Sequence, residues 1–143
     1  YVITYPNNDL GSDYIFNEIK KLKKNINFIV IPSLRFEFFL TLLKNSSFII
    51  GNSSCGIMEA PYYGIPTINI GDRQKNRFGS KSLLNINFNK NDINRTINST
   101  ENKKFLKFNF FGKGNSANKI EKIISSKKFW EIKLQKGFID LVK

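Results

Sequence analysis

The sequence predicts an α/β protein in which helices cover both faces of a parallel β-sheet. The first observation is a series of short, continuous apolar runs at residues 2–5, 27–31, 47–50 and 67–70. Strands buried on both faces have such runs, whereas a strand with one wet face alternates apolar and polar residues. The second observation is that stretches with helical spacing separate these runs, which is typical of crossover helices joining parallel strands.

Each further element is expected from its apolar spacing or its flanking residues. The first helix, at residues 12–25, places Ile15, Phe16, Ile19 and Leu22 on one face. After the strand at 27–31, the expected elements are an unusually apolar helix at 36–44, the strand at 47–50, a short helix at 56–63, the strand at 67–70, an edge strand at 83–88, and helices at 91–98 and 116–126. Residues 99–114 show no clear period. Residues 129–142 can form another amphipathic helix, interrupted near Gly137.

Composition limits the class of protein and of site. The 143 residues suffice for one domain with a sizeable core, and no apolar run approaches the roughly 20 residues of a membrane span. A single cysteine, Cys55, excludes an internal disulfide and fits a reducing compartment, so we expect a cytoplasmic protein. The sequence has no histidine, so it supplies no histidine base or ligand, and we expect no metal site and no cofactor. The only methionine is Met58, so we expect the chain to begin partway through a longer product.

The net charge of +12 is concentrated after residue 80. A nucleic-acid surface would gather the basic side chains on one face with aromatic residues between them. Here the lysines are scattered among asparagine and isoleucine, so we expect a solvated basic surface and no nucleic-acid binding. The excess charge can still attract an anionic ligand.

The most informative stretch is GNSSCGIMEAP at residues 51–61, between two of the expected strands. A small-residue turn that opens a helix presents backbone N–H groups and hydroxyls, which suit a phosphate. Asn52, Ser53 and Ser54 supply these groups, and Gly51 and Gly56 would keep the backbone accessible to a pyrophosphate. The serines can instead simply cap the helix. One turn can serve both purposes.

Other polar residues follow the strands or lie on the short helix. Glu59 is a single carboxylate in an otherwise apolar helix, where the two hydroxyls of a ribose would supply donors; the alternative is an acidic residue that complements the helix dipole. Arg73 and Arg77 follow a strand and suit phosphate oxygens. Asn7 and Ser12 lie in the first strand-to-helix loop, whose residues are also good turn formers. Because ligands of parallel sheets gather beyond the carboxyl ends of the strands, these loops should converge at one edge.

Four segments, in order, resemble the hydrolysing UDP-N-acetylglucosamine 2-epimerases. They are TYPNNDLGS at 4–12, similar to the family's T-Y-P-N-x-D-x-G loop; the GNSSCGIMEAP stretch; GDRQKNR at 71–77, similar to G-D-R-Q-x-x-R; and FGKGN at 111–115, similar to Y-G-x-G-N. The resemblance implies the carboxy-terminal, Rossmann-like lobe of a two-lobed, glycosyltransferase-B-like enzyme. We expect a UDP-binding domain at 1–126 and a helical tail at 127–143.

The resemblance also implies roles for residues. Ser53 and Ser54 match the family's phosphate contacts, Glu59 its ribose contact and Arg73 a phosphate contact, with Arg77 in support. Asn7 and Ser12 match residues near the nucleotide, and the loop at 32–35 resembles the backbone that reads uracil. Cys55 matches a position that is serine in many relatives and is expected to be a turn residue.

The implied reaction converts UDP-GlcNAc to N-acetylmannosamine and UDP through a 2-acetamidoglucal intermediate. The family's catalytic carboxylates come mainly from an amino-terminal lobe, so we expect no catalytic residue in this chain and no turnover by it alone. UDP-N,N'-diacetylbacillosamine is an equal candidate substrate, and a homo-oligomer is expected for the complete enzyme. Two alternatives stay open: the donor lobe of a glycosyltransferase, and a non-catalytic remnant or interaction module.

Overall fold

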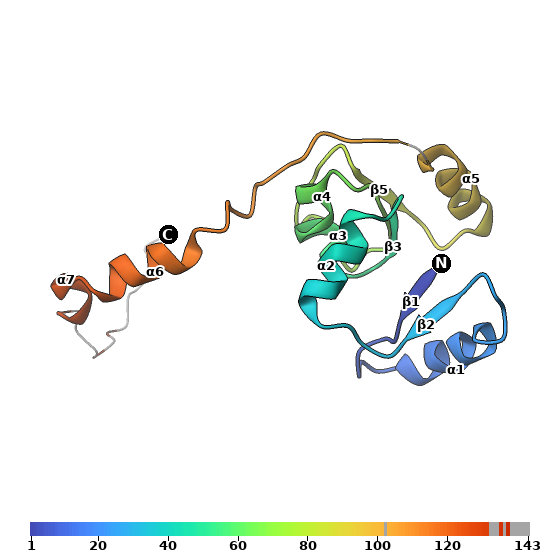
Figure 1. The fold of residues 1–143 in the computed structure, drawn as a ribbon, viewed down its shortest axis with the longest axis horizontal. Coiled ribbons are helices and arrows are strands. Elements are labelled where there is room, and N and C mark those ends of the chain that lie inside the picture. Colours follow the sequence, from blue (N-terminus) through green and yellow to red (C-terminus); the bar gives the residue numbers. More distant parts are fainter. Residues whose placement is uncertain (102, 132–134, 136, 138–143) are drawn as a thin grey trace. The chain divides into compact units, whose positions relative to one another are not determined.

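The computed structural model describes residues 1–101, 103–131, 135 and 137 (Figure 1). The chain forms two compact units, residues 1–108 and residues 109–143. All of the described strands belong to the first unit. The division into a nucleotide-binding domain at 1–126 and a tail at 127–143 stays a prediction.

The strands of the first unit pair in parallel, as predicted. They are β1 (Val2–Thr4), β2 (Ile29–Ile31), β3 (Ile49–Gly51), β4 (Thr67–Ile70) and β5 (Leu83–Ile86). β1 pairs with β2, and β4 lies between β3 and β5, with Ile68 opposite both Ile50 and Leu84. The strands thus form two parallel sheets instead of the single expected one, because no ladder joins β1 to β3 in the described part of the chain.

Helices separate the strands as the apolar spacing indicates. In the first unit they are α1 (Ser12–Leu22), α2 (Phe36–Lys44), α3 (Cys55–Met58), α4 (Ala60–Tyr63) and α5 (Lys90–Thr100). α1 ends three residues before the expected end of the first helix, and β2 begins two residues after the expected start of the second strand. The reason is a local turn: the Asn25 N–H donates to the Leu22 carbonyl oxygen at 2.9 Å, and the Asn25 side chain accepts from the Asn27 N–H at 3.0 Å.

The expected helix at 56–63 is two separate turns, α3 and α4, joined at Glu59. Pro61 explains the break, because it has no N–H to donate to the carbonyl of Ile57. Pro61 instead lies in the first turn of α4, where a missing N–H costs nothing.

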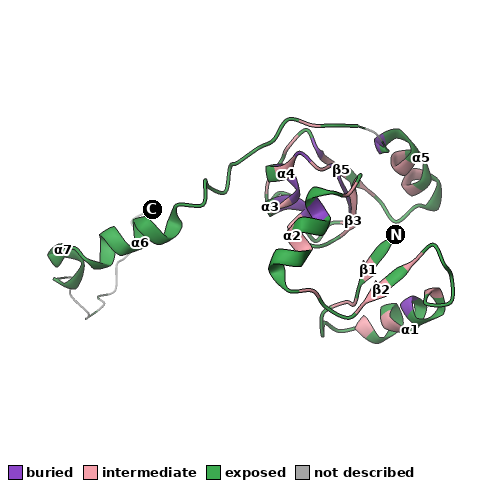
Figure 2. Cartoon of the chain, viewed as in Figure 1, coloured by how far each residue is buried: buried purple, intermediate pink, exposed green. Residues whose placement is uncertain are grey.

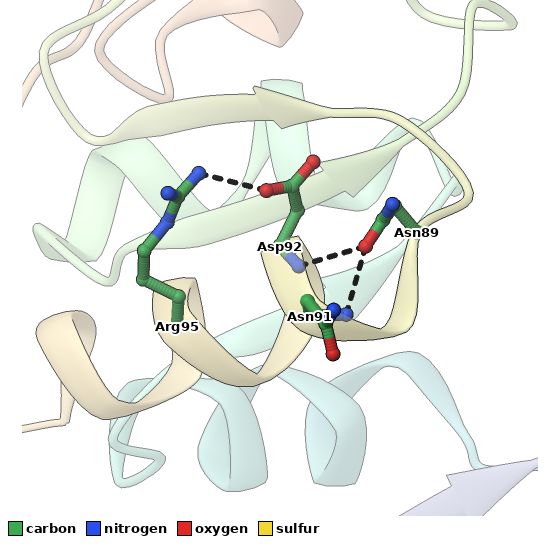
Figure 3. Close-up of polar contacts among 4 residues, drawn as sticks. All are labelled: Asn89, Asn91, Asp92 and Arg95. Atoms are coloured by element: carbon green, nitrogen blue, oxygen red, sulfur yellow. Dashed lines mark hydrogen bonds and ion pairs between the residues drawn. The ribbon is translucent and has the colours of Figure 1, made fainter.

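The α5 helix begins one residue before the predicted range, at the position that a cap on its amino end sets, and ends two residues after that range (Figure 3). The Asn89 side-chain oxygen accepts from the N–H groups of Asn91 and Asp92, at 2.8 and 3.2 Å. Arg95 then donates to the Asp92 carboxylate at 2.7 Å, one turn further on. The cap satisfies two helix donors that would otherwise have no partner.

The buried residues of the first unit lie mainly on β4 and on α3 and α4 (Figure 2). Ile68 and Ala60 have no exposed surface, and Ile57 is 3 % exposed. The aperiodic stretch after α5 returns to this core: the Phe108 N–H donates to the Pro61 carbonyl oxygen at 2.8 Å. The Phe105 backbone lies so close to Gly64 that a Cβ added at Gly64 would be 2.5 Å from the Phe105 carbonyl oxygen.

The second unit contains the helices α6 (Ser116–Ile124) and α7 (Lys127–Trp130). The Trp130 indole N–H donates to the Ile124 carbonyl oxygen at 2.6 Å and holds α7 against the end of α6. The predicted tail helix at 129–142 falls largely outside the described residues. Among those that are described, no helix is long and apolar enough to cross a membrane.

Candidate functional site

Three loops that follow strands meet at one edge of the first unit. The Arg73 guanidinium, after β4, lies 3.7 Å from the Asp9 carboxylate, after β1. The Gln74 side chain, also after β4, donates to the Asn52 carbonyl oxygen, after β3, at 2.9 Å. These two contacts confirm that the segments at 5–12, 51–56 and 71–77 converge.

The turn after β3 carries the exposed polar groups that the sequence indicates. Gly51 has φ of +146°, a conformation that residues with a side chain rarely adopt. Asn52 and Ser53 are exposed and Ser54 is half-buried. Within the described residues, the N–H groups of Ser53 and Ser54 donate to no protein acceptor. The turn can therefore donate several hydrogen bonds to an anion.

Two expected features of this turn are corrected. Ser54 occupies the N-cap position of α3, but its side chain makes no capping hydrogen bond. α3 has only four residues, so few aligned peptide dipoles contribute and the helix adds little positive potential. An anion here would depend on the hydroxyls, the free N–H groups and a nearby cation.

Gly56 is buried, contrary to the expectation that it keeps the backbone open to a ligand. A Cβ at this position would lie 2.5 Å from Cγ2 of Thr67. The Thr67 hydroxyl donates to the Gly56 carbonyl oxygen at 2.6 Å. Gly56 therefore lets α3 pack directly against β4, which fixes the distance of the turn from the sheet.

Glu59, between α3 and α4, has an unsatisfied carboxylate. Its Oε2 atom is buried and has no hydrogen-bond partner among the described residues. Burial raises the pKa of the Glu59 carboxyl, and its own backbone N–H offsets part of that rise. A buried carboxylate oxygen without a donor is costly, so a ligand that brings hydroxyl donors would relieve a real deficit.

The two arginines predicted to bind a phosphate are placed differently. Arg73 is about half exposed, and its contact with Asp9 is long enough to be exchanged for another anion. Arg77 donates to Oε1 of Gln74 at 2.9 Å. Arg73 can thus reach a ligand directly, whereas Arg77 is already engaged with the protein.

Asn7 and Ser12 lie on the same loop with different surroundings. Asn7 is exposed and lines a polar cavity of about 420 Å³ together with Pro32 and Ser33 from the loop after β2. Ser12 begins α1, and its N–H donates to the Asp9 carbonyl oxygen at 3.0 Å. The structure thus places Asn7 at a cavity next to the convergent loops, and Ser12 within the hydrogen-bonded turn.

A larger cavity, of about 880 Å³, lies between β1 and β3. Its lining is mostly apolar, with Phe28, Phe39 and Phe48 among its side chains, and it reaches Ser53 and Cys55. Burial raises the pKa of the Cys55 thiol, which keeps it in the unreactive neutral form. The described residues contain no cluster of three or more candidate metal ligands.

The profile of the family described as UDP-N-acetylglucosamine 2-epimerase matches residues 1–125. The chain belongs to the UDP-N-acetylglucosamine 2-epimerase family. This membership favours an epimerase over the alternative of a glycosyltransferase donor lobe.

Sequence identity to individual members of the epimerase family supports this assignment. Over 96 % of its length the chain is 40 % identical to a UDP-N-acetylglucosamine 2-epimerase of Neisseria meningitidis serogroup B, of which it covers 37 %. Over 47 % of its length it is 40 % identical to a Campylobacter jejuni protein named GDP/UDP-N,N'-diacetylbacillosamine 2-epimerase (hydrolyzing), of which it covers 17 %. The chain spans between 17 % and 37 % of the length of these relatives.

A solved structure supports the predicted fold. The UDP-GlcNAc 2-epimerase of Methanocaldococcus jannaschii, in complex with UDP-GlcNAc and UDP, superimposes with a TM-score of 0.69 at 25 % identity. The match covers 87 % of this chain and 35 % of that one. The glycosyltransferase-B-like, Rossmann-like fold expected for this epimerase-family chain is confirmed.

Sequence analysis missed Gln74 as a site residue. The signal in the sequence was its place in the GDRQKNR turn between charged neighbours, where a glutamine looks like one more exposed residue. In the structure of this epimerase-family chain it is 2 % exposed and connects two of the convergent loops.

Proposed function

We propose that this chain is the UDP-binding part of a hydrolysing UDP-N-acetylglucosamine 2-epimerase. The observation that carries the proposal is Glu59, whose buried Oε2 atom has no donor among the residues that the structure describes. Glu59 lies at the carboxyl end of α3, whose first residues, Cys55 and Gly56, end the GNSSCG turn. The two hydroxyls of a ribose would supply the missing donors.

The other site residues divide between the phosphates and the support of the turn. Ser53, Ser54 and Arg73 offer donors to the diphosphate. Asn7 and Ser12, on the loop after β1, lie on the nucleotide side of the site. The remaining candidates, Gly51, Asn52, Gly56 and Arg77, hold the geometry of the turn.

The reaction that we propose for the complete enzyme is the hydrolysing one. A base removes the proton at C2 of the sugar while the C1–O bond breaks, and UDP leaves with the bonding electrons, which gives 2-acetamidoglucal. Water then adds across the new double bond, with the hydroxyl at C1 and the proton at C2 on the opposite face, which gives N-acetylmannosamine.

This chain binds the leaving group in that scheme. It has no histidine, and Glu59 is the acidic residue that we assign to the ribose. We therefore place the acid and base residues in the amino-terminal lobe of the complete enzyme, and we expect the isolated chain to bind UDP without turnover.

The proposed substrate is UDP-GlcNAc or UDP-N,N'-diacetylbacillosamine. The names of the relatives include both kinds of epimerase, and the sugar would lie mostly against the other lobe. We propose a cytoplasmic enzyme, in keeping with its single free Cys55, and a homo-oligomer for the complete protein.

Calorimetric titration of the purified chain with UDP tests the proposal, with UMP and ADP as control ligands. We expect UDP to bind more tightly than either. Glu59→Ala should weaken UDP binding by about 1–3 kcal/mol, because a charged hydrogen-bond acceptor is lost. Glu18→Ala is the matched control, since it removes an exposed carboxylate on α1 that pairs with Lys21.

Three outcomes would contradict the proposal in different ways. Absence of UDP binding by a folded chain would favour a non-catalytic module. An unchanged affinity in Glu59→Ala would remove that residue from the ribose site. Transfer of the sugar to an acceptor by the complete protein, with no release of N-acetylmannosamine, would return the glycosyltransferase alternative.

A further inference from the structure

Gln74 connects the loop after β4 to the turn after β3. Its Nε2 atom donates to the Asn52 carbonyl oxygen at 2.9 Å, across 22 positions of sequence. Only 2 % of the residue is exposed, although Arg73 and Lys75 on either side of it are exposed. A buried side-chain amide can be held in this way only if its polar atoms find partners.

The other end of the amide is also satisfied. Oε1 of Gln74 accepts from the Arg77 guanidinium at 2.9 Å. A guanidinium can only donate and a carbonyl can only accept, so these two partners fix which end of the amide faces which loop. Arg77 thereby holds Gln74 in the one orientation that reaches Asn52.

The turn that Gln74 contacts is tied to α3 through the carbonyl oxygens of Ser53 and Ser54, which accept from the Gly56 and Ile57 N–H groups, but not through its own N–H groups. Gly51 has φ of +146°, and a Cβ at this position would have no atom within 4 Å. The N–H groups of Ser53 and Ser54 donate to no protein acceptor in the described part of the chain. The side-chain contact from Gln74 to Asn52 is therefore an anchor for the segment that presents these groups.

We infer that Gln74 is a positioning residue that presets the turn at 51–54 for the diphosphate, and that Arg77 acts through Gln74 and not on the ligand. The inference rests on the proposed function, because the diphosphate is the ligand whose binding the turn would control. It also revises the role of Arg77, from a phosphate contact to the support of a neighbouring side chain.

The test compares the unsubstituted chain with the variant Gln74→Met, which keeps the length of the side chain and removes both hydrogen bonds. UDP affinity should fall about three- to tenfold, the range for one lost hydrogen bond, while uridine affinity stays unchanged. Thr100→Val is the matched control: it alters another fully buried polar side chain, at the end of α5, and should leave both affinities unchanged.

Arg77→Met provides a second variant. Because Arg77 is exposed, this substitution should leave the chain folded. If Arg77 acts through Gln74, its removal weakens UDP binding in the wild-type background and has no further effect in the Gln74→Met background. Additive losses in the double variant would mean that Arg77 contacts the ligand, and would overturn that half of the inference.

A measurement on the free chain separates this inference from the proposed function. The amide NMR signals of Ser53 and Ser54 should shift in both Gln74→Met and Arg77→Met, and stay in place in Thr100→Val. Unchanged signals and unchanged UDP affinity in Gln74→Met would overturn the inference while UDP binding stands. If the wild-type chain binds no UDP, the proposed function fails, and the inferred control of diphosphate binding fails with it; the signals then report on the anchor alone.

Discussion

Glu59 has a pKa raised by burial, which makes the stability of the chain depend on pH at this residue. The folded chain holds the proton more tightly than the unfolded chain does. The carboxyl therefore contributes stability below its unfolded pKa, and this contribution is lost as the pH rises through the folded pKa. Glu59→Gln has no such titration, so it should be more stable than the wild type at neutral pH, and the gain should shrink on acidification.

Urea unfolding of wild type and Glu59→Gln at neutral and acidic pH measures this difference. Glu18→Gln, which makes the same chemical change at an exposed carboxylate of α1, serves as the control. If the free energies of unfolding of Glu59→Gln and wild type differ by the same amount at every pH, the titration assigned to Glu59 is contradicted.

Gly56 allows a second prediction for a single residue. In Gly56→Ala the added Cβ would meet Cγ2 of Thr67 at 2.5 Å, in the best-packed part of the chain. Either α3 or the Thr67 side chain must move, and we expect the free energy of unfolding to fall by about 1–3 kcal/mol. Denaturant unfolding checks this.

Gly79→Ala is the matched glycine for that experiment. A Cβ at Gly79 would have no atom within 4 Å, and the residue has no positive φ. The substitution should therefore be neutral, or slightly stabilising because it restricts the unfolded chain. Equal losses in the two variants would mean that close packing against Thr67 is not the cause.

The cap of α5 provides the prediction at the level of an element. Asn89→Ala removes the acceptor for the Asn91 and Asp92 N–H groups, and should cost about 0.5–2 kcal/mol of stability. Asn91→Ala is the control, because it changes an exposed asparagine inside the helix to the residue with the best helix propensity. Thermal unfolding followed by circular dichroism should rank Asn89→Ala below the control; the opposite order would contradict the cap.

The regular elements were predictable where the apolar pattern and the flanking turn residues indicate the same boundaries. The helix at Phe36–Lys44 and the strand at Thr67–Ile70 have the predicted bounds, because each is a short, largely apolar segment with turn-forming residues on both sides. The break at Glu59 was missed, although Pro61 lies two residues further on and its effect on a helix follows from its missing N–H.

The site was predictable as a set of loops but not as a set of contacts. Convergence followed from parallel strands, and the contacts of Asp9 with Arg73 and of Asn52 with Gln74 confirm it. The burial of Gln74 could not be predicted, because a loop glutamine becomes an interior residue only through the path of a second loop. The direction of the Arg77 side chain depends on the same tertiary contact.

The whole molecule exposes a large amount of apolar surface for its size. Leu10, Ile26 and Leu106 are each more than 90 % exposed, whereas the buried hydrophobic residues described are Ile19, Leu43, Ile57, Ala60 and Ile68. The cavity between β1 and β3 adds contiguous, mostly apolar surface, and such surface usually marks an interface with another chain or domain. We predict that the isolated chain self-associates.

Light scattering across a range of protein concentrations measures that association. The expected result is an average mass that rises above the 16.5 kDa of one chain as the concentration increases. In the two-lobed enzyme that we propose, adding the amino-terminal lobe should reduce the average mass by covering this surface. A constant mass of one chain at every concentration would contradict the prediction.

The contact between Gly56 and Thr67 has a consequence for how sequences of this family can diverge. The two positions lie on different elements and share one space that is too small for a Cβ and a threonine methyl together. A side chain at position 56 is therefore compatible only with a smaller residue at position 67. A protein that carries only one of the two changes is less stable than a protein that carries neither or both. In lineages that descend from a common ancestor, we expect the two positions to be inherited as a pair and replaced together.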